Sequence, residues 1–484
     1  MDRIIITEQD LSTNNITEEQ IVDVVFIPGF ASGENATDPV AAYVPTFCSS
    51  IADFEAHFGT IPAKFKDDQM YPKYVAGDTK TKTPAVDGFM PDAIPTPLVG
   101  DNPGEEGTLW FSSGMYDPSY IYAKEILYSG LPIMYYRMNE YQNQADENYD
   151  VTIEQVYKIF KTKLFNADGK ITKDSEIELL DKGEYQFKYL TSGAYPVFEY
   201  CVNDRPSAIT EAMCKMATKR GDCVAFIDHT DNHERPLQST VDGVMSVYTA
   251  VNKYAIPEDY DTYGTMITPW CSFKVNGLYP TAKTYTNEIE LPGSFAYFKC
   301  LAQMLNSDSD WLAVAGVTRG LIPNFRSLCT TVPLTNRIAD SYQSEPNSTG
   351  RGVSINAITN VKPYGYCIWG NRTLRNQEES RVGFALNFLN IRNLVSDVKK
   401  QAYVAAKSLM FEQNNEVLWL NFKSLLMPLL DQMVSGEGLS SYKVIKNVTQ
   451  DKTRLSATIR LYPVYAIESF EIMITLEDEE VTVQ

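Results

Sequence analysis

The chain has 484 residues, of which 44% are hydrophobic and 21% charged, and its formal net charge is −20. This composition is typical of a globular protein, and the length predicts roughly two to four domains because single cores stop growing near ~250–300 residues. The acidic excess argues against binding along a nucleic-acid backbone, where lysine and arginine must displace counterions. The longest apolar runs, such as Trp311–Val317, are far shorter than the ~18 residues that span a bilayer, so membrane insertion is not expected.

The N-terminus and the cysteines favour synthesis in the cytoplasm. Residues Met1–Glu8 lack the basic region and the long apolar stretch of a signal peptide. The eight cysteines contain no Cys-x-x-Cys pair, which favours reduced and mostly buried thiols. Residues 1–20 are polar apart from Ile4, Ile5 and Ile6, and they cannot bury themselves. We interpret them as an N-terminal arm whose short β-prone stretch can join another subunit's sheet.

Alternating strands and helices over residues 21–350 predict a central α/β domain. Strands are expected at Val22–Ile27 (with a turn at Pro28-Gly29), Ala41–Cys48, Leu131–Arg137, Asp222–Ile227 and Gly264–Cys271. Helices are expected at Ser50–Phe58, Ser119–Ser129, Ala208–Lys219, Val241–Tyr254 and Ser294–Leu305. Residues 60–107 are rich in Pro, Gly, Asp and Lys, and residues 140–200 are charged and tyrosine-rich. Both are interpreted as insertions.

Residues 351–476 predict a second α/β domain with two long helices. The first, Ile391–Phe411, has one apolar stripe at helical spacing. Its opposite side carries the cations Arg392, Lys399, Lys400 and Lys407. The second, Val417–Val434, is apolar on most faces and is expected to be well buried, with a kink at Pro428. Alternating residues at Leu455–Leu461 and Phe470–Leu476 predict strands with one solvated face.

One polar cluster has the residue types of a metal site. It comprises Asp228, His229, Asp231, His233 and Glu234, with the two histidines four residues apart. On a helix this spacing could hold zinc, but the segment directly follows a predicted strand, which favours a solvated loop. The chain also lacks phosphate-binding and nucleophile-elbow motifs. We therefore expect no catalytic residues, no bound metal and no cofactor.

The last third of the chain contains a characteristic order of segments, namely Val353–Ile358, Gly365–Leu374, Asn390–Asn415, Trp419, Gly436–Tyr442, Pro463 and Glu468–Ile472. This order resembles the C-terminal domain of contractile phage tail sheath proteins. A looser similarity covers Val24–Gly29, Pro39–Cys48, Asp53–Glu55, Phe58-Gly59, Tyr120–Gly130 and Pro132–Arg137. The loop Asn447–Lys452 is shorter than in that family. Matches in one order over ~120 residues rarely arise by chance.

The resemblance implies a structural subunit, not an enzyme. Such subunits stack as hexameric rings around an inner tail tube and contract to drive it through a host envelope. The implied partners are other copies of the chain, the tail tube protein, and the baseplate and tail terminator proteins. The implied location is the phage tail of a virion, assembled in the host cytoplasm.

The resemblance also assigns roles to particular segments. It implies that Ile4–Ile6 and the end of the chain, with Val481 and Val483 in the arm 477–484, each complete a neighbour's sheet. The C-terminal domain lies innermost in this family, so Arg392, Lys399, Lys400 and Lys407 are expected to face the tube. The overall expectation is an α/β (α+β) multidomain protein with a central core, insertions, and a C-terminal domain completed by exchanged terminal strands.

Two alternatives remain open from the sequence. A sheath from a bacterial contractile injection system, such as a pyocin-like particle, would share these features. A cytosolic metal-dependent hydrolase built on Asp228–Glu234 would need a third ligand, which the sequence does not indicate.

Overall fold

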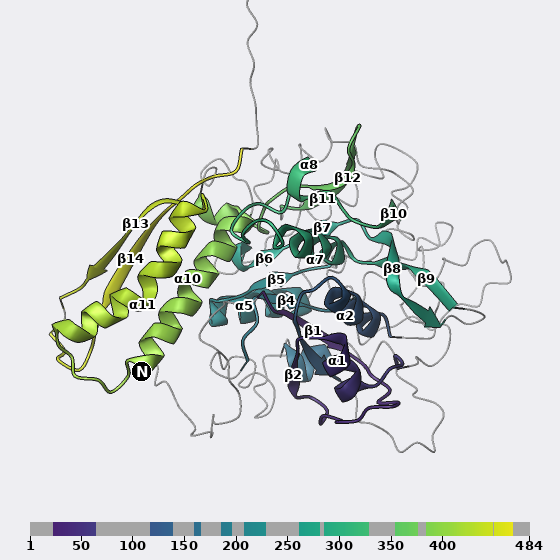
Figure 1. The fold of residues 1–484 in the computed structure, drawn as a ribbon, viewed down its shortest axis with the longest axis horizontal. Helices are drawn as coiled ribbons and strands as arrows, with labels where there is room; N and C mark the ends of the chain where they lie inside the picture. Colours follow the sequence, from purple (N-terminus) through teal and green to yellow (C-terminus); the bar gives the residue numbers. More distant parts are fainter. Residues whose placement is uncertain are drawn as a thin grey trace, which may run out of the picture.

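The computed structural model describes residues 23–63, 117–138, 159–165, 185–195, 208–228, 261–280, 285–328, 354–375, 384–448 and 450–467. These residues form a body around a central sheet, with a second group of helices and strands at one side of it (Figure 1). Residues 389–463 of that second group are called the C-terminal unit, and the other described residues the body. No described helix is both long and apolar enough to cross a bilayer.

A six-stranded sheet with the order β2-β3-β1-β4-β5-β6 lies at the centre of the body. Its strands are β1 (Val25–Gly29), β2 (Pro45–Cys48), β3 (Ile133–Arg137), β4 (Tyr189–Thr191), β5 (Val224–Phe226) and β6 (Gly264–Thr265). Neighbouring strands are parallel except for β2, which is antiparallel to β3. All five strands predicted in residues 21–350 overlap observed strands, so the α/β character of the body is confirmed.

Strand β1 extends two residues further than predicted. Pro28 pairs with Tyr136 and Gly29 with Arg137, so the expected turn at these residues is wrong. A Cβ atom at Gly29 would lie 2.3 Å from the Tyr135 hydroxyl oxygen. Glycine at this position therefore allows close packing inside a strand. In the sequence, the same glycine after a proline indicates a turn.

Strand β4 falls within the predicted insertion 140–200 but belongs to the central sheet. It lies between β1 and β5 in the central sheet, and its three residues are buried. The strand is short, and Lys188 beside it is charged but buried, so the segment carried no recognisable strand pattern. Residues 187–195 are buried and are therefore part of the body's core.

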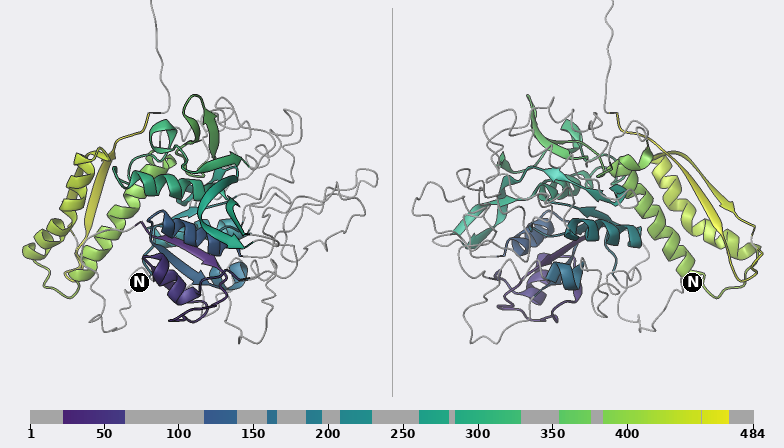
Figure 2. Two further views of the ribbon diagram at one scale, coloured as in Figure 1. Left: turned by 45° about the vertical axis from the view of Figure 1, so that its right-hand side comes forward. Right: turned by 180° about the vertical axis from the view of Figure 1, so that it is seen from behind.

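Helices cover the sheet of the body on both sides. They are α1 (Ile51–Phe58), α2 (Pro118–Tyr128), α5 (Ala208–Arg220) and α7 (Gly293–Met304). As predicted, Ser50 caps α1: its side chain accepts a hydrogen bond of 3.2 Å from the Asp53 amide. Helices α2 and α7 lie on the side facing the viewer in Figure 1, and α5 lies on the opposite side, seen from behind in Figure 2. The predicted helix Val241–Tyr254 lies outside the described residues.

Two smaller sheets extend the body. One has the order β10-β8-β9, with β8 at Cys271–Pro280, β9 at Tyr285–Leu291 and β10 at Phe325–Leu328. The other joins β7 (Ile267–Thr268), β11 (Asn356–Val361) and β12 (Gly365–Trp369). Short helical turns occur at Phe160–Leu164, Asp261–Tyr263, Gly316–Arg319 and Ala385–Asn387. Because β11 pairs in parallel with β7, residues 356–369 share the hydrophobic core of the body.

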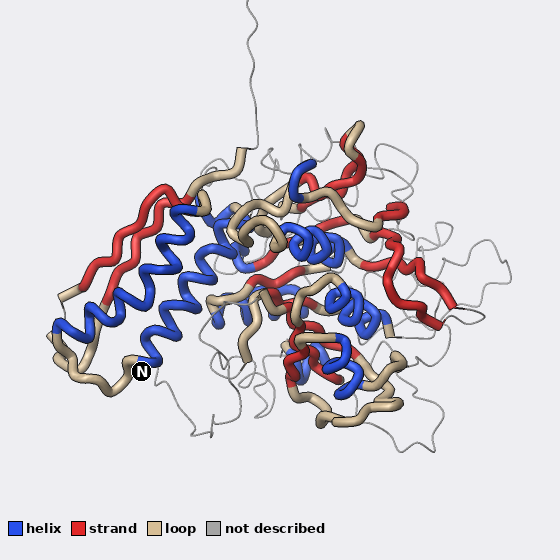
Figure 3. The backbone as a smooth tube through the Cα atoms, viewed as in Figure 1, coloured by secondary structure: helices blue, strands red, loops and turns tan. Residues whose placement is uncertain are grey.

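The C-terminal unit consists of two helices and a hairpin around a second hydrophobic core. Its elements are α10 (Leu389–Ser408), α11 (Glu416–Ser435), β13 (Leu439–Lys446) and β14 (Ala457–Pro463). The helices lie side by side with the hairpin packed along α11 (Figure 3). Both predicted helices and the strand at Leu455–Leu461 are confirmed. The predicted strand Phe470–Leu476 lies outside the described residues.

Helix α11 is less buried than its sequence suggested. Only one side of it faces the second core, and on the other side Val417 is 61% and Leu420 57% exposed. The helix continues through Pro428 to Ser435. The prediction of a well-buried helix is therefore wrong within the subunit, because only one side of the helix packs on the second core.

Candidate assembly surfaces and the domain junction

The hairpin of β13 and β14 forms a two-stranded sheet with open edges. The two strands pair from Leu439–Pro463 to Lys446–Ala457, and no other described strand pairs with either of them. One face of the hairpin packs on the second core through partly buried side chains, namely Tyr442, Val444, Ala457, Ile459 and Leu461. A two-stranded sheet is marginally stable alone, and its unpaired edges accept further strands. This hairpin is therefore a candidate site for strand addition.

The segments expected to add strands lie outside the described residues. These are Ile4, Ile5 and Ile6 in the N-terminal arm and Val481 and Val483 in the C-terminal arm. Their exchange between subunits therefore stays a prediction. The last described residues of the chain follow β14, and among them Val464, Tyr465 and Ile467 are exposed.

The four cations predicted to share one face of α10 do not form one exposed surface. Arg392 is 2% exposed, and its Nε and Nη2 atoms donate to the Thr262 carbonyl (2.9 Å) and the Thr262 hydroxyl (2.6 Å). Its guanidinium carbon lies 4.0 Å from the centroid of the Tyr263 ring. Burial lowers the pKa of Arg392 below its ordinary value. Arg392 therefore joins α10 to the body, and its prediction as a tube-facing surface residue is wrong.

The three lysines of α10 differ in exposure. Lys399 is exposed, and its Nζ donates to the Tyr263 hydroxyl at 2.8 Å. Lys400 is half-buried in a small cleft lined also by Asp222 and Tyr403, and burial lowers its pKa. Lys407 is exposed near the end of the helix. Of the predicted cationic face, only Lys399 and Lys407 are thus open to a partner.

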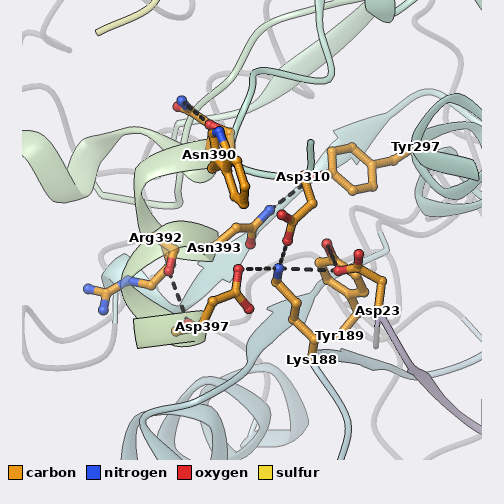
Figure 4. Close-up of polar contacts among 11 residues, drawn as sticks. Asp23, Lys188, Tyr189, Tyr297, Asp310, Asn390, Arg392, Asn393 and Asp397 are labelled. Atoms are coloured by element: carbon orange, nitrogen blue, oxygen red, sulfur yellow. Dashed lines mark hydrogen bonds and ion pairs between the residues drawn. The ribbon is translucent and has the colours of Figure 1, made fainter. Parts of the chain in front are cut away.

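A buried charge cluster lies where α10 meets the body (Figure 4). Lys188 is fully buried, and its Nζ lies 3.2 Å from Asp23 Oδ1 and 2.8 Å from Asp397 Oδ2. Asp310 contacts the same Nζ. The Tyr189 hydroxyl donates to Asp23 Oδ1 at 2.9 Å. Burial raises the pKa of the Asp397 carboxyl, against the attraction of Lys188.

The first member of the suspected metal cluster has a structural partner. Asp228 is buried after β5, and its two carboxylate oxygens accept from the Ser294 amide (3.2 Å) and the Ser294 hydroxyl (2.7 Å). It therefore caps the first turn of α7. Burial raises its pKa to about 7. Residues 229–234 lie outside the described residues, and among the described ones no group of His, Cys, Asp or Glu has metal-binding geometry.

The arrangement of the body and the C-terminal unit is also found in solved structures. Two solved structures share it over almost the whole chain. The chain matches one from the anti-feeding prophage baseplate in the contracted state with a TM-score of 0.54 and 15% identity, covering 99% of this chain and 100% of the other. It matches one from the sheath complex of PVC, an extracellular contractile injection system, with a TM-score of 0.51 and 13% identity, covering 99% and 98%.

The sequence itself matches a curated tail sheath protein. The relative comes from Vibrio phage KVP40, and it is 26% identical over 163 residues, which is 32% of this chain. The matched part spans only 22% of the phage protein's length. No family model matches the chain. The sequence match and the structural match to a sheath complex confirm the resemblance to tail sheath proteins.

Proposed function

We propose that the chain is the repeating subunit of a contractile sheath, which polymerises as stacked hexameric rings around an inner tube and contracts to drive the tube through an envelope. The observation that carries this proposal is the β13–β14 hairpin, whose edges are open to added strands. The sheath fold and the sequence match to a phage tail sheath protein support it.

Strand exchange explains how an acidic chain can polymerise. With a net charge of −20, copies repel one another at long range, so their attraction must come from short-range contacts. Strand addition provides backbone hydrogen bonds, and exposed apolar side chains of the hairpin itself, such as Tyr462 and Ile445, provide burial. We propose that the two arms of neighbouring copies fill the edges of this hairpin.

We further propose that the sheath belongs to a phage tail, assembled in the host cytoplasm, with the tail tube, baseplate and tail terminator proteins as partners. The match to the Vibrio phage protein favours this setting. The structural matches to anti-feeding prophage and PVC particles favour an extracellular contractile injection system as the alternative. Particles purified from the producing cells discriminate the two, because sheaths attached to DNA-filled capsids support the phage and headless sheaths support the injection system.

Electron microscopy of the purified chain tests polymerisation directly. We expect hollow tubes to form when salt is raised from about 10 mM to several hundred mM, because screening shortens the range of repulsion from roughly 30 Å to below 10 Å. The measurement is negative-stain imaging with sedimentation across the same salt series. A chain that stays monomeric at every salt and protein concentration contradicts the proposal.

Reversing the two exposed lysines of α10 tests the contact with the tube. We expect the Lys399→Glu, Lys407→Glu double variant to form sheaths that no longer hold a tube in the extended state, because two cations become anions. The readout is the fraction of extended, tube-filled particles. The matched control reverses Lys215 and Lys219, two exposed lysines on α5 of the body. Equal loss in both variants would show that net charge matters and not this helix.

A further inference from the structure

One residue of the body completes the second hydrophobic core. Among the described residues, Trp311 is the one buried member of that core outside the C-terminal unit, and the rest come from α10, α11 and β13. Its Nε1 donates to the Gly436 carbonyl at 2.9 Å, and its own carbonyl accepts from Asn390 Nδ2 at 3.0 Å. Trp311 therefore joins the body to α10 and to the end of α11 at once.

The residue before this tryptophan belongs to the buried charge cluster. Asp310 contacts Lys188, which also binds Asp23 next to β1 and Asp397 on α10. Figure 4 shows the three carboxylates converging on the lysine nitrogen from different segments. The dipeptide Asp310-Trp311 thus makes an ionic contact inside the body and an apolar contact inside the C-terminal unit.

The cluster depends on the positive charge of Lys188. Three carboxylates surround one ammonium group, and the Oδ1 atom of Asp397 is buried with no hydrogen-bond partner. Removing one partner of a buried ion pair costs more than the pair contributes, because an uncompensated charge is left in a medium of low dielectric. Without Lys188, the carboxylates of the body would repel Asp397, and Asp397 is carried by α10.

Apolar contacts alone would hold the C-terminal unit less specifically. Hydrophobic packing is non-directional, whereas the lysine nitrogen fixes the position of the Asp397 carboxylate to within a hydrogen-bond length. Arg392 adds a second directional contact one turn earlier, at Thr262. The junction therefore combines the buried Trp311 with two directional contacts, at Asp397 and Arg392, that set the orientation of α10 on the body.

We propose that Lys188, Asp310, Trp311 and Asp397 form an interdomain lock that fixes the orientation of the C-terminal unit on the body, and that the charge of Lys188 keeps the lock closed. The lock is a property of the single subunit. Its consequence for a sheath rests on the proposed function: a unit that contacts the tube can transmit force to the body only while its orientation is held.

Hydrogen exchange of the full chain at low ionic strength, followed by mass spectrometry, tests the lock. In the Lys188→Met variant we expect the first half of α10, residues 389–398, to exchange at least about tenfold faster, while β3 in the body is unchanged. Lys446→Met is the matched control. Lys446 pairs with Glu416 at 2.8 Å on the exposed surface of the same unit, and its removal should change neither region.

A rescue variant separates the lock from simple core damage. Adding Asp397→Asn to Lys188→Met removes one of the uncompensated carboxylates, so we expect it to restore a large part of the protection of α10. Faster exchange in β3 together with α10 would overturn the proposal, because Lys188 would then only support the core of the body. Unchanged α10 exchange, or no rescue, would overturn it as well. Exchange in the unassembled subunit is independent of sheath formation, so a chain that forms no sheath can still show the lock.

Discussion

Removal of residues 1–20 is expected to abolish sheath formation while leaving a folded, soluble subunit. The segment is polar apart from Ile4–Ile6, so it adds little apolar burial to its own subunit. If it adds a strand to the hairpin of a neighbour, its loss leaves one edge of β13–β14 unfilled in every copy. Polymerisation should then fail at all salt concentrations, because screening removes repulsion but supplies no contact.

The measurement combines circular dichroism, for folding, with sedimentation and negative-stain imaging, for assembly. A matched control replaces residues 8–20 with a Gly/Ser linker of equal length and keeps Ile4–Ile6, and it should still assemble. An unfolded truncation would show that the segment belongs to the subunit's own fold. Normal tubes from the truncation would show that this arm is not exchanged.

A cavity in the second core is expected to give the largest loss of stability for a single substitution. Leu426 on α11 is fully buried, and Leu426→Ala should lower the free energy of unfolding of the C-terminal unit by about 2–5 kcal/mol. Leu420 on the same helix is the matched control, because it is 57% exposed and its truncation should cost less than about 0.5 kcal/mol in the free subunit.

In the assembled state, we expect the exposed Leu420 to matter more than it does for folding of the free subunit. If the exposed side of α11 contacts another chain, Leu420→Ala should weaken assembly even though it spares folding. Thermal unfolding of the free subunit and the protein concentration needed for tube formation measure the two effects separately. An equal loss of subunit stability in both variants would contradict the one-sided burial of this helix.

The sequence predicted most elements whose burial follows a regular pattern. Both long helices of the C-terminal unit and the capped helix α1 appear where periodicity and capping residues indicated them. Strand β4 was missed because three residues carry no periodicity and because Lys188, which precedes them, is normally a surface residue. The burial of Lys188 depends on Asp23, Asp310 and Asp397, which are distant in sequence, so no local pattern could predict it.

The cationic face of α10 was misread for a related reason. Helical periodicity correctly placed the apolar stripe, and the opposite side was assumed to meet solvent. In the structure the first half of α10 is enclosed by the body, so its polar residues Arg392, Asn393, Ser396 and Asp397 are buried as well. A run of Asn, Ser and Asp among the apolar residues of a helix's first half was the available signal, because such side chains can satisfy one another at a junction.

The close packing of Trp311 against Gly436 and Gly438 provides a pattern for comparing this chain with structures of low sequence identity. A Cβ atom at Gly438 would lie 2.5 Å from the indole Cδ1, and one at Gly436 would lie 2.8 Å from Cζ2. A side chain at either position would force the indole to shift, so we expect substitutions at these three positions to be energetically coupled. In a structure that shares the fold at 15% identity, a large aromatic residue opposite two glycines would mark equivalent positions that the overall identity does not align.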